Sequence, residues 1–338
     1  MEKIKVALIG FGGIARIHYN AYKKLQREGS PLSVVAVCEK NVDSVRKNVT
    51  INLGTVTETL DDSIHIYADV DELIGNEDFD VADICLPSFL HKEMTVKLLL
   101  AGKHVFCEKP MALCSEDCEE MLSAADVSGK RLMIGQCVRF DPLYLYLKKC
   151  VDNNLFGELK YMTMHRLSEY PRWSPAFSDL AKTGGCTIDT HVHDIDVARY
   201  ILGDPLSVSA TEFIKLPYCQ VVHSRLDYKN CTVLAECCWD ESRAVKFESG
   251  YRAIFENATV VCNGNSLKVY ENGKAPYEPD IEMADEIVEE LRAFSSLVQD
   301  PTAENKQNDP KDSCLSIKLI EKIKESARLG GKIVKLSL

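Results

Sequence analysis

The sequence predicts an α/β protein of two domains, with a doubly wound parallel sheet in residues 1–138 and an α+β domain in residues 139–338. A glycine-rich turn follows the first apolar run, and strand-like runs then alternate with helical patterns as far as Gly135. Such alternation is typical of a parallel sheet. After Gly203, short β-patterns separated by turn residues indicate an open, mainly antiparallel sheet in the second domain.

The composition indicates a soluble globular protein. The 338 residues are 46% hydrophobic and 27% charged. The net charge of −11 argues against nucleic acid as the main partner. No apolar run approaches the roughly 20 residues that span a bilayer, and the start lacks a signal peptide, so no membrane association and a cytoplasmic location are expected. Fourteen cysteines without a CxxC pair predict free thiols and no metal site.

The first apolar run, residues 4–9, is predicted to be a buried strand that ends at a G-x-G-x-x-A turn. Gly10 permits the tight reversal, Gly12 lets a pyrophosphate approach, and Ala15 lets the next helix pack on its strand. The free N–H groups of that helix would face the anion. The predicted nucleotide contacts are Gly10, Phe11, Gly12, Gly13, Ile14 and Ala15. An ordinary turn is the alternative.

Glu39 directs the cofactor prediction toward NAD. A helix is expected over 15–28 and a strand over 32–38, so Glu39 stands at the end of the second strand. An acidic residue there accepts hydrogen bonds from ribose hydroxyls and repels a 2′-phosphate. Lys40 weakens this preference, because it could reach a phosphate. A solvated charge at a strand end is the alternative for Glu39.

Further polar residues stand where later strands end. The pattern predicts strands over 64–67, 81–86, 104–107 and 132–135, and helices over 70–75, 92–101 and 115–128. Ligands of such sheets bind beyond the carboxyl ends of the strands. Candidate cofactor contacts there are Pro87, His91, Glu108, Lys109 and Gln136.

The second half is predicted to be mostly strands. Strands are expected over 159–164, 207–214, 220–227, 232–239, 252–256, 259–262, 267–270 and 333–336, and helices over 142–153, 194–202, 281–298 and 312–328. The C-terminal helix is a candidate to pack back on the first domain.

Three motifs together resemble the Gfo/Idh/MocA family of NAD(P)-dependent sugar and polyol oxidoreductases, which includes inositol dehydrogenases. They are GFGGIA near the start, HVFCEKP at 104–110 and TGGCTIDTHVHDID at 183–196. The resemblance implies a Rossmann domain followed by an α/β domain with an open sheet. It also implies a homodimer or homotetramer assembled through that sheet's open face.

The stretch 189–196 allows two interpretations. An HxH pair on a strand would point both imidazoles to one face, as in metal hydrolases. The helical spacing of the apolar residues favours a helix instead, with Asp189, His193 and Asp196 on one face. His191 then joins the apolar stripe and is predicted to be a packed histidine.

Hydride transfer needs a base for the hydroxyl proton and a positive group for the developing alkoxide. The resemblance places the active-site lysine at Lys109 and the polar catalytic pair at Asp189 and His193. His193 is the predicted general base, Lys109 would lower the pKa of the reacting hydroxyl, and Asp189 would orient substrate or His193. The division of labour between Lys109 and His193 stays open.

Four residues are further candidates for substrate contact: Arg139, Arg166, Arg172 and Trp173. Arg139 could equally meet an acidic neighbour, and the other three could lie in an ordinary surface loop.

The predicted function is an NAD-dependent dehydrogenase of a polyol, sugar or sugar derivative. The alternatives are a non-catalytic dinucleotide sensor, a metal hydrolase built on His191 and His193, and an epimerase or glycosidase that works through transient oxidation.

Overall fold

The chain divides into two compact units. The fold is that of a computed structural model that describes residues 3–47, 49–51, 54–56, 60–172, 174–215 and 219–336. Unit 1 comprises Met1–Cys137 and Asp285–Cys314, and unit 2 comprises Val138–Ala284 and Leu315–Leu338. The second domain predicted over 139–338 is therefore interrupted, because a segment late in the sequence belongs to unit 1.

A six-stranded parallel sheet forms the centre of the described part of unit 1, in the order β5-β2-β1-β6-β7-β8. This is the doubly wound order, in which the crossover direction reverses between β1 and β6. The strands are β1 Ile4–Ile9, β2 Leu32–Cys38, β5 His65–Tyr67, β6 Val81–Ile84, β7 His104–Glu108 and β8 Leu132–Gly135. Strands β6 and β8 are buried along their whole length, because helices cover both faces of the sheet.

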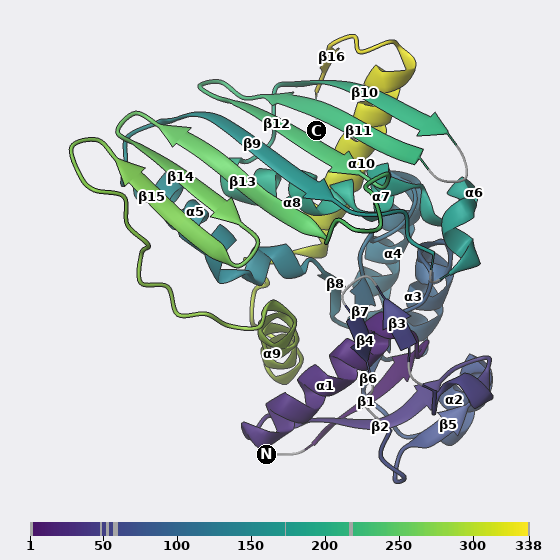
Figure 1. Ribbon diagram of the computed structural model, residues 1–338. Helices are drawn as coiled ribbons and strands as arrows, with labels where there is room; N and C mark the ends of the chain where they lie inside the picture. The colour runs from purple at the N-terminus through teal and green to yellow at the C-terminus, as the bar shows by residue number, and fades with distance from the viewer. Residues whose placement is uncertain are drawn as a thin grey trace. The chain divides into compact units, whose positions relative to one another are not determined.

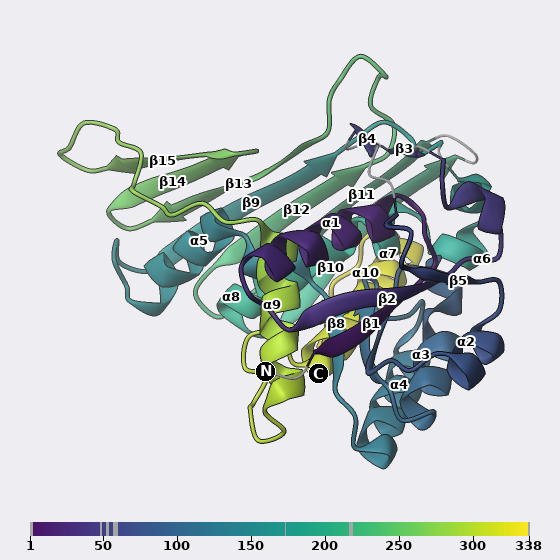
Figure 2. The same ribbon diagram turned by 90° about the horizontal axis from the view of Figure 1, so that it is seen from below.

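Helices α1 and α9 lie together on one face of this sheet, and α3 and α4 lie on the other (Figures 1 and 2). The helical segments are α1 Gly13–Arg27, η1 Val42–Ser44, α2 Val70–Asn76, η2 Ser88–Leu90, α3 His91–Leu100, α4 Ser115–Ser128 and α9 Glu286–Gln299. A short hairpin joins β3 Val49–Ile51 and β4 Gly54–Val56. Strands β2 and β8 and helix α4 have the predicted bounds.

Helix α9 belongs to unit 1 because its apolar side packs there. The Phe294 ring lies edge-to-face on Phe106 of β7, with 5.5 Å between centroids. On its outer side, Arg292 Nη2 lies 2.7 Å from Glu28 Oε2. The helix begins five residues later than predicted, because the Asp285 carboxylate accepts hydrogen bonds from the N–H groups of Ile287 and Val288.

The described part of unit 2 is built on a mixed sheet of eight strands, in the order β15-β14-β13-β9-β12-β11-β10-β16. Only the β9–β12 pair is parallel within it, so the predicted mainly antiparallel sheet is confirmed. The strands are β9 Leu159–Leu167, β10 Ser207–Lys215, β11 Cys219–Asp227, β12 Thr232–Cys238, β13 Glu248–Phe255, β14 Ala258–Asn263, β15 Ser266–Glu271 and β16 Val334–Lys335.

Helices cover one face of this sheet and leave the other open. In Figure 1 the helices α5, α7 and α8 lie behind the sheet, and no described helix of unit 2 lies on the face toward the viewer. The described helical segments between residues 137 and 202 are η3 Cys137–Phe140, α5 Pro142–Asp152, η4 Pro175–Ser178, α6 Leu180–Thr183, α7 Cys186–Asp189 and α8 His191–Leu202. The last helix, α10 Pro310–Arg328, begins in unit 1 and ends in unit 2.

Candidate active site

The glycine turn joins β1 to α1 and leaves the start of the helix open. Gly10 has a φ of +85°, and a Cβ there would lie 3.0 Å from the carbonyl oxygen of Cys85. Gly12 is the N-cap of α1, has no side chain to cap the helix, and has no atom within 4 Å of an added Cβ. The first N–H groups of α1 therefore have room for an anion.

The Glu39 carboxylate is bound to the same turn. One oxygen accepts a hydrogen bond from the Phe11 N–H at 3.0 Å, and the other accepts one from the Asn41 N–H at 2.9 Å. Glu39 is half-buried, whereas the neighbouring Lys40 is exposed. Each carboxylate oxygen can accept a second hydrogen bond, so ribose hydroxyls could still be recognised here.

Gln136 directly follows β8 and carries a polar group without a hydrogen-bond partner among the described residues. Its side chain is 2% exposed, and its Nε2 is buried. A buried amide nitrogen left unsatisfied is costly, so this group calls for an acceptor. Pro87, after β6, is exposed.

His91 does not face solvent, which corrects its prediction as a cofactor contact. The ring is 1% exposed, with Nδ1 2.7 Å from the Pro110 carbonyl oxygen and Nε2 2.8 Å from that of Leu86. Burial lowers the pKa of His91. The ring therefore connects the loops that follow β6 and β7 and is not available to a ligand.

Lys109 follows β7 and is half-buried, and its peptide bond to Pro110 is cis. Its backbone N–H donates to Glu108 Oε2 at 3.1 Å. The other Glu108 oxygen faces His18 Nε2 at 3.0 Å. Glu108, predicted to contact the cofactor, is thus buried in a network inside unit 1, while Lys109 keeps part of its side chain accessible.

Together these features fit a dinucleotide. Pyrophosphate needs the free helix start at Gly12, ribose needs an acceptor such as Glu39, and a carboxamide oxygen needs a donor such as the Gln136 amide. All three stand at the carboxyl ends of parallel strands, where ligands of doubly wound sheets bind.

In unit 2, Asp189 and His193 lie on two successive short helices. Helix α7 ends at Asp189 and α8 begins at His191, with Thr190 between them. The break is held by Trp239, whose Nε1–H donates to Thr190 Oγ1 at 2.9 Å. Asp189 and His193 are both half-buried, whereas all other residues of 191–199 are buried. The sequence did not predict α7 as a separate helix.

His191 is the packed histidine that the sequence predicts. It is fully buried, and its Nε2 lies 2.7 Å from Ser224 Oγ of β11. Burial, aided by the nearby Arg166 guanidinium, lowers the pKa of His191 to about 3. The ring is therefore neutral at physiological pH, and its pairing with His193 in a metal site would require it to leave the core.

Two arginines predicted as candidates for substrate contact are buried in ion pairs. For Arg139 this is the acidic neighbour that the sequence allowed as the alternative, and for Arg166 neither substrate contact nor a surface loop is found. Arg139 is 1% exposed and binds Asp196 through two hydrogen bonds of 2.7 and 2.8 Å. Arg166 is 7% exposed, with Nη2 2.9 Å from Asp194 Oδ1. Both aspartates are on α8, so these arginines anchor the helix that carries His193.

The other two candidates remain predictions. Arg172 is exposed, and its guanidinium lies 5.7 Å from the Tyr170 ring centroid. Trp173 lies outside the described residues.

One group of functional candidates was missed by sequence reasoning. His18 of α1 is fully buried between Asp83 of β6 and Glu108 of β7. The available signal was the charged Asp83 inside the apolar run VADICL. A buried charge on a central strand requires a partner, and that partner lies 65 residues away in sequence.

The doubly wound unit with its glycine turn, joined to a second unit with an open sheet, defines a two-domain dinucleotide-dependent oxidoreductase. Residues 4–136 match the family described as "Oxidoreductase family, NAD-binding Rossmann fold", and residues 144–271 match the Gfo/Idh/MocA C-terminal domain. The chain therefore belongs to the Gfo/Idh/MocA oxidoreductases, and its first unit is an NAD-binding Rossmann domain.

Curated relatives carry related names. The chain is 26% identical over 271 residues to "Inositol 2-dehydrogenase" of Rhizobium meliloti (strain 1021), across 80% of this chain and 73% of that protein. It is 34% identical over 203 residues to "Inositol 2-dehydrogenase/D-chiro-inositol 3-dehydrogenase" of Shouchella clausii (strain KSM-K16), across 60% of this chain and 54% of that protein. The match thus spans about half the length of the second relative.

Solved structures share the fold. Aldose-aldose oxidoreductase from Caulobacter crescentus, complexed with glycerol, has a TM-score of 0.83 at 22% identity, covering 99% of this chain and 100% of that one. Levoglucosan dehydrogenase, in complex with NADH and L-sorbose, has a TM-score of 0.82 at 18% identity, covering 100% of both chains.

Within the described residues, no helix has the length and apolar character needed to cross a membrane.

Proposed function

We propose that this chain is an NAD-dependent dehydrogenase that acts on a hydroxyl-bearing carbon of a polyol, sugar or sugar derivative. Its family membership and the inositol dehydrogenases among its relatives support this assignment. The single observation that best supports this assignment is the exposure of His193. In a helix whose neighbouring positions are buried and held by Arg139 and Arg166, His193 alone among residues 191–199 is half-buried, and the others are buried.

In this proposal His193 takes the hydroxyl proton while the substrate carbon loses a hydride and becomes a carbonyl. An imidazole suits this step because its ordinary pKa of about 6.5 allows proton exchange near neutral pH. Nicotinamide, when bound, supplies the hydride acceptor. Asp189, half-exposed just before α8, would accept hydrogen bonds from substrate hydroxyls or orient His193.

Lys109 would stabilise the alkoxide that develops as the proton leaves. Its ammonium group is a compact positive charge, and its backbone is held by Glu108 on one side and the buried Pro110 on the other.

The cofactor part of the proposal assigns the adenosine ribose to Glu39 and the pyrophosphate to the turn 10–15. Gln136 would donate its free amide N–H to the nicotinamide carboxamide. A carboxylate at Glu39 favours NAD over NADP, because it would repel a 2′-phosphate.

The test is a panel of inositols, other polyols and sugars, followed by NADH absorbance with NAD and, separately, with NADP. His193→Asn and Lys109→Met should each lower kcat on the best substrate by roughly 10²-fold or more, as expected for the loss of a proton-transfer or charge-stabilising group. His65→Asn is the control, because His65 is an exposed histidine of unit 1 that pairs with Glu77 and takes part in none of the proposed contacts.

The outcomes separate the candidate functions. Turnover lost in both variants and kept in the control supports the dehydrogenase. Product formed without net NADH would indicate an epimerase or glycosidase working through transient oxidation. NAD binding without turnover of any polyol or sugar would contradict the proposal and favour a sensor.

We also propose that the open face of the unit 2 sheet is the contact between copies of this chain in a homodimer or homotetramer. Three large apolar side chains lie exposed on its strands: Phe213 at 60%, Leu234 at 38% and Tyr270 at 44% exposure. These side chains are spread from β15 to β10 across a face without a described helix, and exposed apolar groups on such a broad surface favour association with a second surface.

A further inference from the structure

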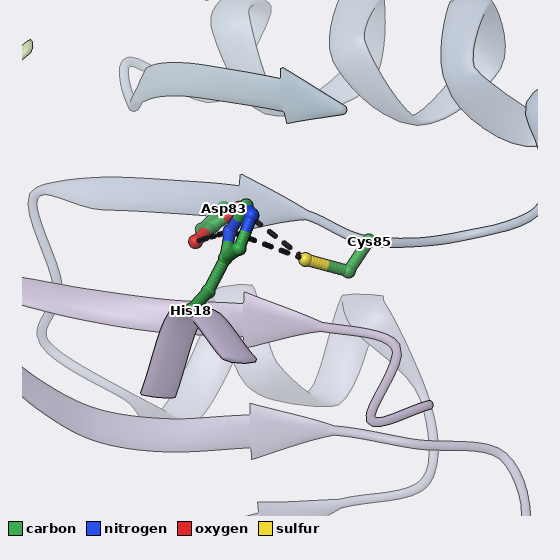
Figure 3. A group of neighbouring side chains, drawn as sticks. All are labelled: His18, Asp83 and Cys85. Atoms are coloured by element: carbon green, nitrogen blue, oxygen red, sulfur yellow. Dashed lines mark hydrogen bonds and ion pairs between the residues drawn. The ribbon is translucent and has the colours of Figure 1, made fainter. Parts of the chain in front are cut away.

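A closed cluster of ionisable side chains lies inside unit 1, at the junction of α1, β6, β7 and α9. His18 of α1 stands at its centre (Figure 3), with Nδ1 2.9 Å from Asp83 Oδ2 and Nε2 3.0 Å from Glu108 Oε1. Asp83 also accepts a hydrogen bond from Tyr22 Oη at 2.9 Å, and the Cys85 thiol lies 3.5 Å from its other oxygen. The proposed catalytic roles use neither His18, Asp83, Tyr22 nor Cys85.

The His18 ring carries a positive charge. Burial is the largest single influence and opposes that charge, but the charges and hydrogen bonds of Asp83 and Cys85 together raise the pKa of His18 well above its ordinary value. The geometry agrees, because carboxylates accept hydrogen bonds and both ring nitrogens face one, which requires an N–H on each. The imidazolium therefore bridges β6 and β7 from the helix above them.

Glu290 of α9 approaches the same ring. Its side chain is fully buried, and neither carboxyl oxygen has a hydrogen-bond partner among the described residues. One of these oxygens, a ring nitrogen of His18 and a Glu108 oxygen all lie within 4.8 Å of one another. Burial and the Glu108 charge raise the pKa of Glu290 well above its ordinary value, which favours the neutral acid at Glu290.

Glu108 connects this cluster to the proposed active-site lysine. Its Oε1 faces His18, and its Oε2 accepts the backbone N–H of Lys109 at 3.1 Å. The carboxylate also requires the absence of a side chain at Gly135 of β8, where a Cβ would lie 2.8 Å from Glu108 Oε1. Three contacts therefore fix the position of the Glu108 carboxylate. They come from His18 of α1, from Gly135 of β8 and from the Lys109 N–H just after its own strand.

We infer that His18 is a positioning residue: its imidazolium fixes the Glu108 carboxylate, which in turn fixes the backbone that presents the Lys109 ammonium group to substrate. The inference rests on the proposed role of Lys109. A lysine with four rotatable side-chain bonds is placed only as precisely as its backbone, and small misplacements of a catalytic group cost large factors in rate.

Two substitutions at position 18 separate the two hydrogen bonds of the ring. His18→Asn keeps a short amide near the Nδ1 position, toward Asp83, and loses the donor to Glu108. His18→Gln places an amide near the Nε2 position and keeps that donor. We expect kcat to fall about tenfold or more in His18→Asn and to be largely restored in His18→Gln, with KM for NAD and substrate unchanged in both.

Tyr22→Phe is the matched control. It removes one hydrogen bond from the same cluster, on the same helix, but at the Asp83 end away from Lys109. It should lower the melting temperature and leave kcat unchanged. If His18→Asn fails to fold, Gly135→Ala tests the same idea, because the added methyl displaces the Glu108 carboxylate and leaves His18 in place. It should lower kcat with KM unchanged.

Lys109→Met, measured beside these variants, distinguishes failure of the positioning role of His18 from failure of the proposed role of Lys109. If Lys109→Met loses turnover but His18→Asn and Gly135→Ala keep the wild-type kcat, the positioning role is wrong and the proposed function stands. If Lys109→Met itself keeps the wild-type kcat, the role of Lys109 is wrong and the inference falls with it. A kcat in Tyr22→Phe that falls as far as in His18→Asn would also overturn the inference, by showing a purely structural cluster.

Nitrogen NMR of the histidine rings gives a readout that is independent of turnover. His18 should show two protonated ring nitrogens at pH 7, the pattern of an imidazolium. The donors of His18, Glu108 and Glu290 could instead hold a divalent cation, which would need a neutral ring with a bare nitrogen. Stoichiometric metal in the purified protein, or a neutral His18, would contradict the inference.

Discussion

Arg139 and Asp196, 57 residues apart in sequence, meet through two parallel hydrogen bonds of 2.7 and 2.8 Å with both side chains buried. Ser316 of α10 adds a third hydrogen bond to the same carboxylate at 2.7 Å. Asp196 lies on α8, one turn beyond His193, so the pair fixes the helix that carries the proposed base.

Breaking this pair should destabilise unit 2 strongly. Arg139→Met leaves the Asp196 charge buried without its main partner, which costs about 3–5 kcal/mol in the free energy of unfolding. The double variant Arg139→Met/Asp196→Asn should recover part of the loss, because the amide carries no charge. Urea unfolding of both measures the difference. Arg225→Met is the control, since the exposed pair of Arg225 with Asp227 contributes at most about 1 kcal/mol. Equal stability of the single and double variants would contradict the argument.

Glu39 should control the choice of dinucleotide. Glu39→Gln can still accept the Phe11 N–H but loses the charge, and a hydrogen bond to a charged group contributes about 1.5–3 kcal/mol. We expect the Kd for NAD to rise by about tenfold or more and the preference over NADP to shrink. Titration calorimetry with both dinucleotides measures this. Lys40→Gln, at the exposed neighbour, should leave NAD binding unchanged. An unchanged preference in Glu39→Gln would show that another group excludes the 2′-phosphate.

Glu290 should make stability depend on pH. In the unfolded chain a glutamate has a pKa of about 4.3, and burial raises it in the folded protein. Between these two pKa values the folded state holds one more proton, so the free energy of unfolding falls as the pH rises through that window. Glu290→Gln has no such proton. Its stability relative to the wild type should therefore increase from acidic to neutral and alkaline pH.

Melting curves at a series of pH values test this prediction. Glu289→Gln is the control, because Glu289 is the neighbouring glutamate on the half-exposed side of α9 and pairs with Arg292. A stability difference between Glu290→Gln and the wild type that does not grow with pH would mean that Glu290 is ionised when buried.

The open sheet face should be sensitive to a single charge. Leu234→Glu places a carboxylate at the middle of that face, between Thr163 of β9 and Arg225 of β11. Desolvating this charge in a contact between copies is costly, so the variant should be monomeric by light scattering while the wild type is a dimer or tetramer. Val127→Glu changes an exposed apolar residue on α4 of unit 1 and should leave the assembly intact. A monomeric wild type would overturn the proposed contact.

The parallel sheet of unit 1 was predictable because its strands carry their own signal. Strands buried on both faces are continuous apolar runs, and glycines or prolines bound them, so β2, β8 and α4 have the expected limits. The break between helices α7 and α8 was less predictable from the sequence. A four-residue helix shows no period, and the break after Asp189 is fixed by a hydrogen bond between Thr190 and Trp239, which lies 49 residues beyond Thr190 in the chain.

The candidate site residues also fall into two groups: those with a local sequence signal and those whose surroundings depend on distant parts of the chain. Local sequence identifies groups that act where a strand ends, and the structure keeps Glu39, Lys109 and Gln136 at such ends. For an arginine or histidine, the local sequence does not reveal whether a carboxylate or a carbonyl from elsewhere in the chain will hydrogen-bond to its side chain. Arg139, Arg166 and His91 were accordingly candidates for ligand contact, with an acidic neighbour as the stated alternative for Arg139, and all three are buried against partners within the protein.

The sequence by itself determined the doubly wound sheet, the glycine turn, the acidic residue that follows β2 and the helical placement of His193, because each depends on the spacing of neighbouring residues. Only the tertiary structure decided that α9 joins unit 1, that His191 is neutral in the core, and that His18 bridges Asp83 and Glu108. Those outcomes depend on which charged groups are desolvated together, and desolvation is a property of the packed chain, not of any one segment.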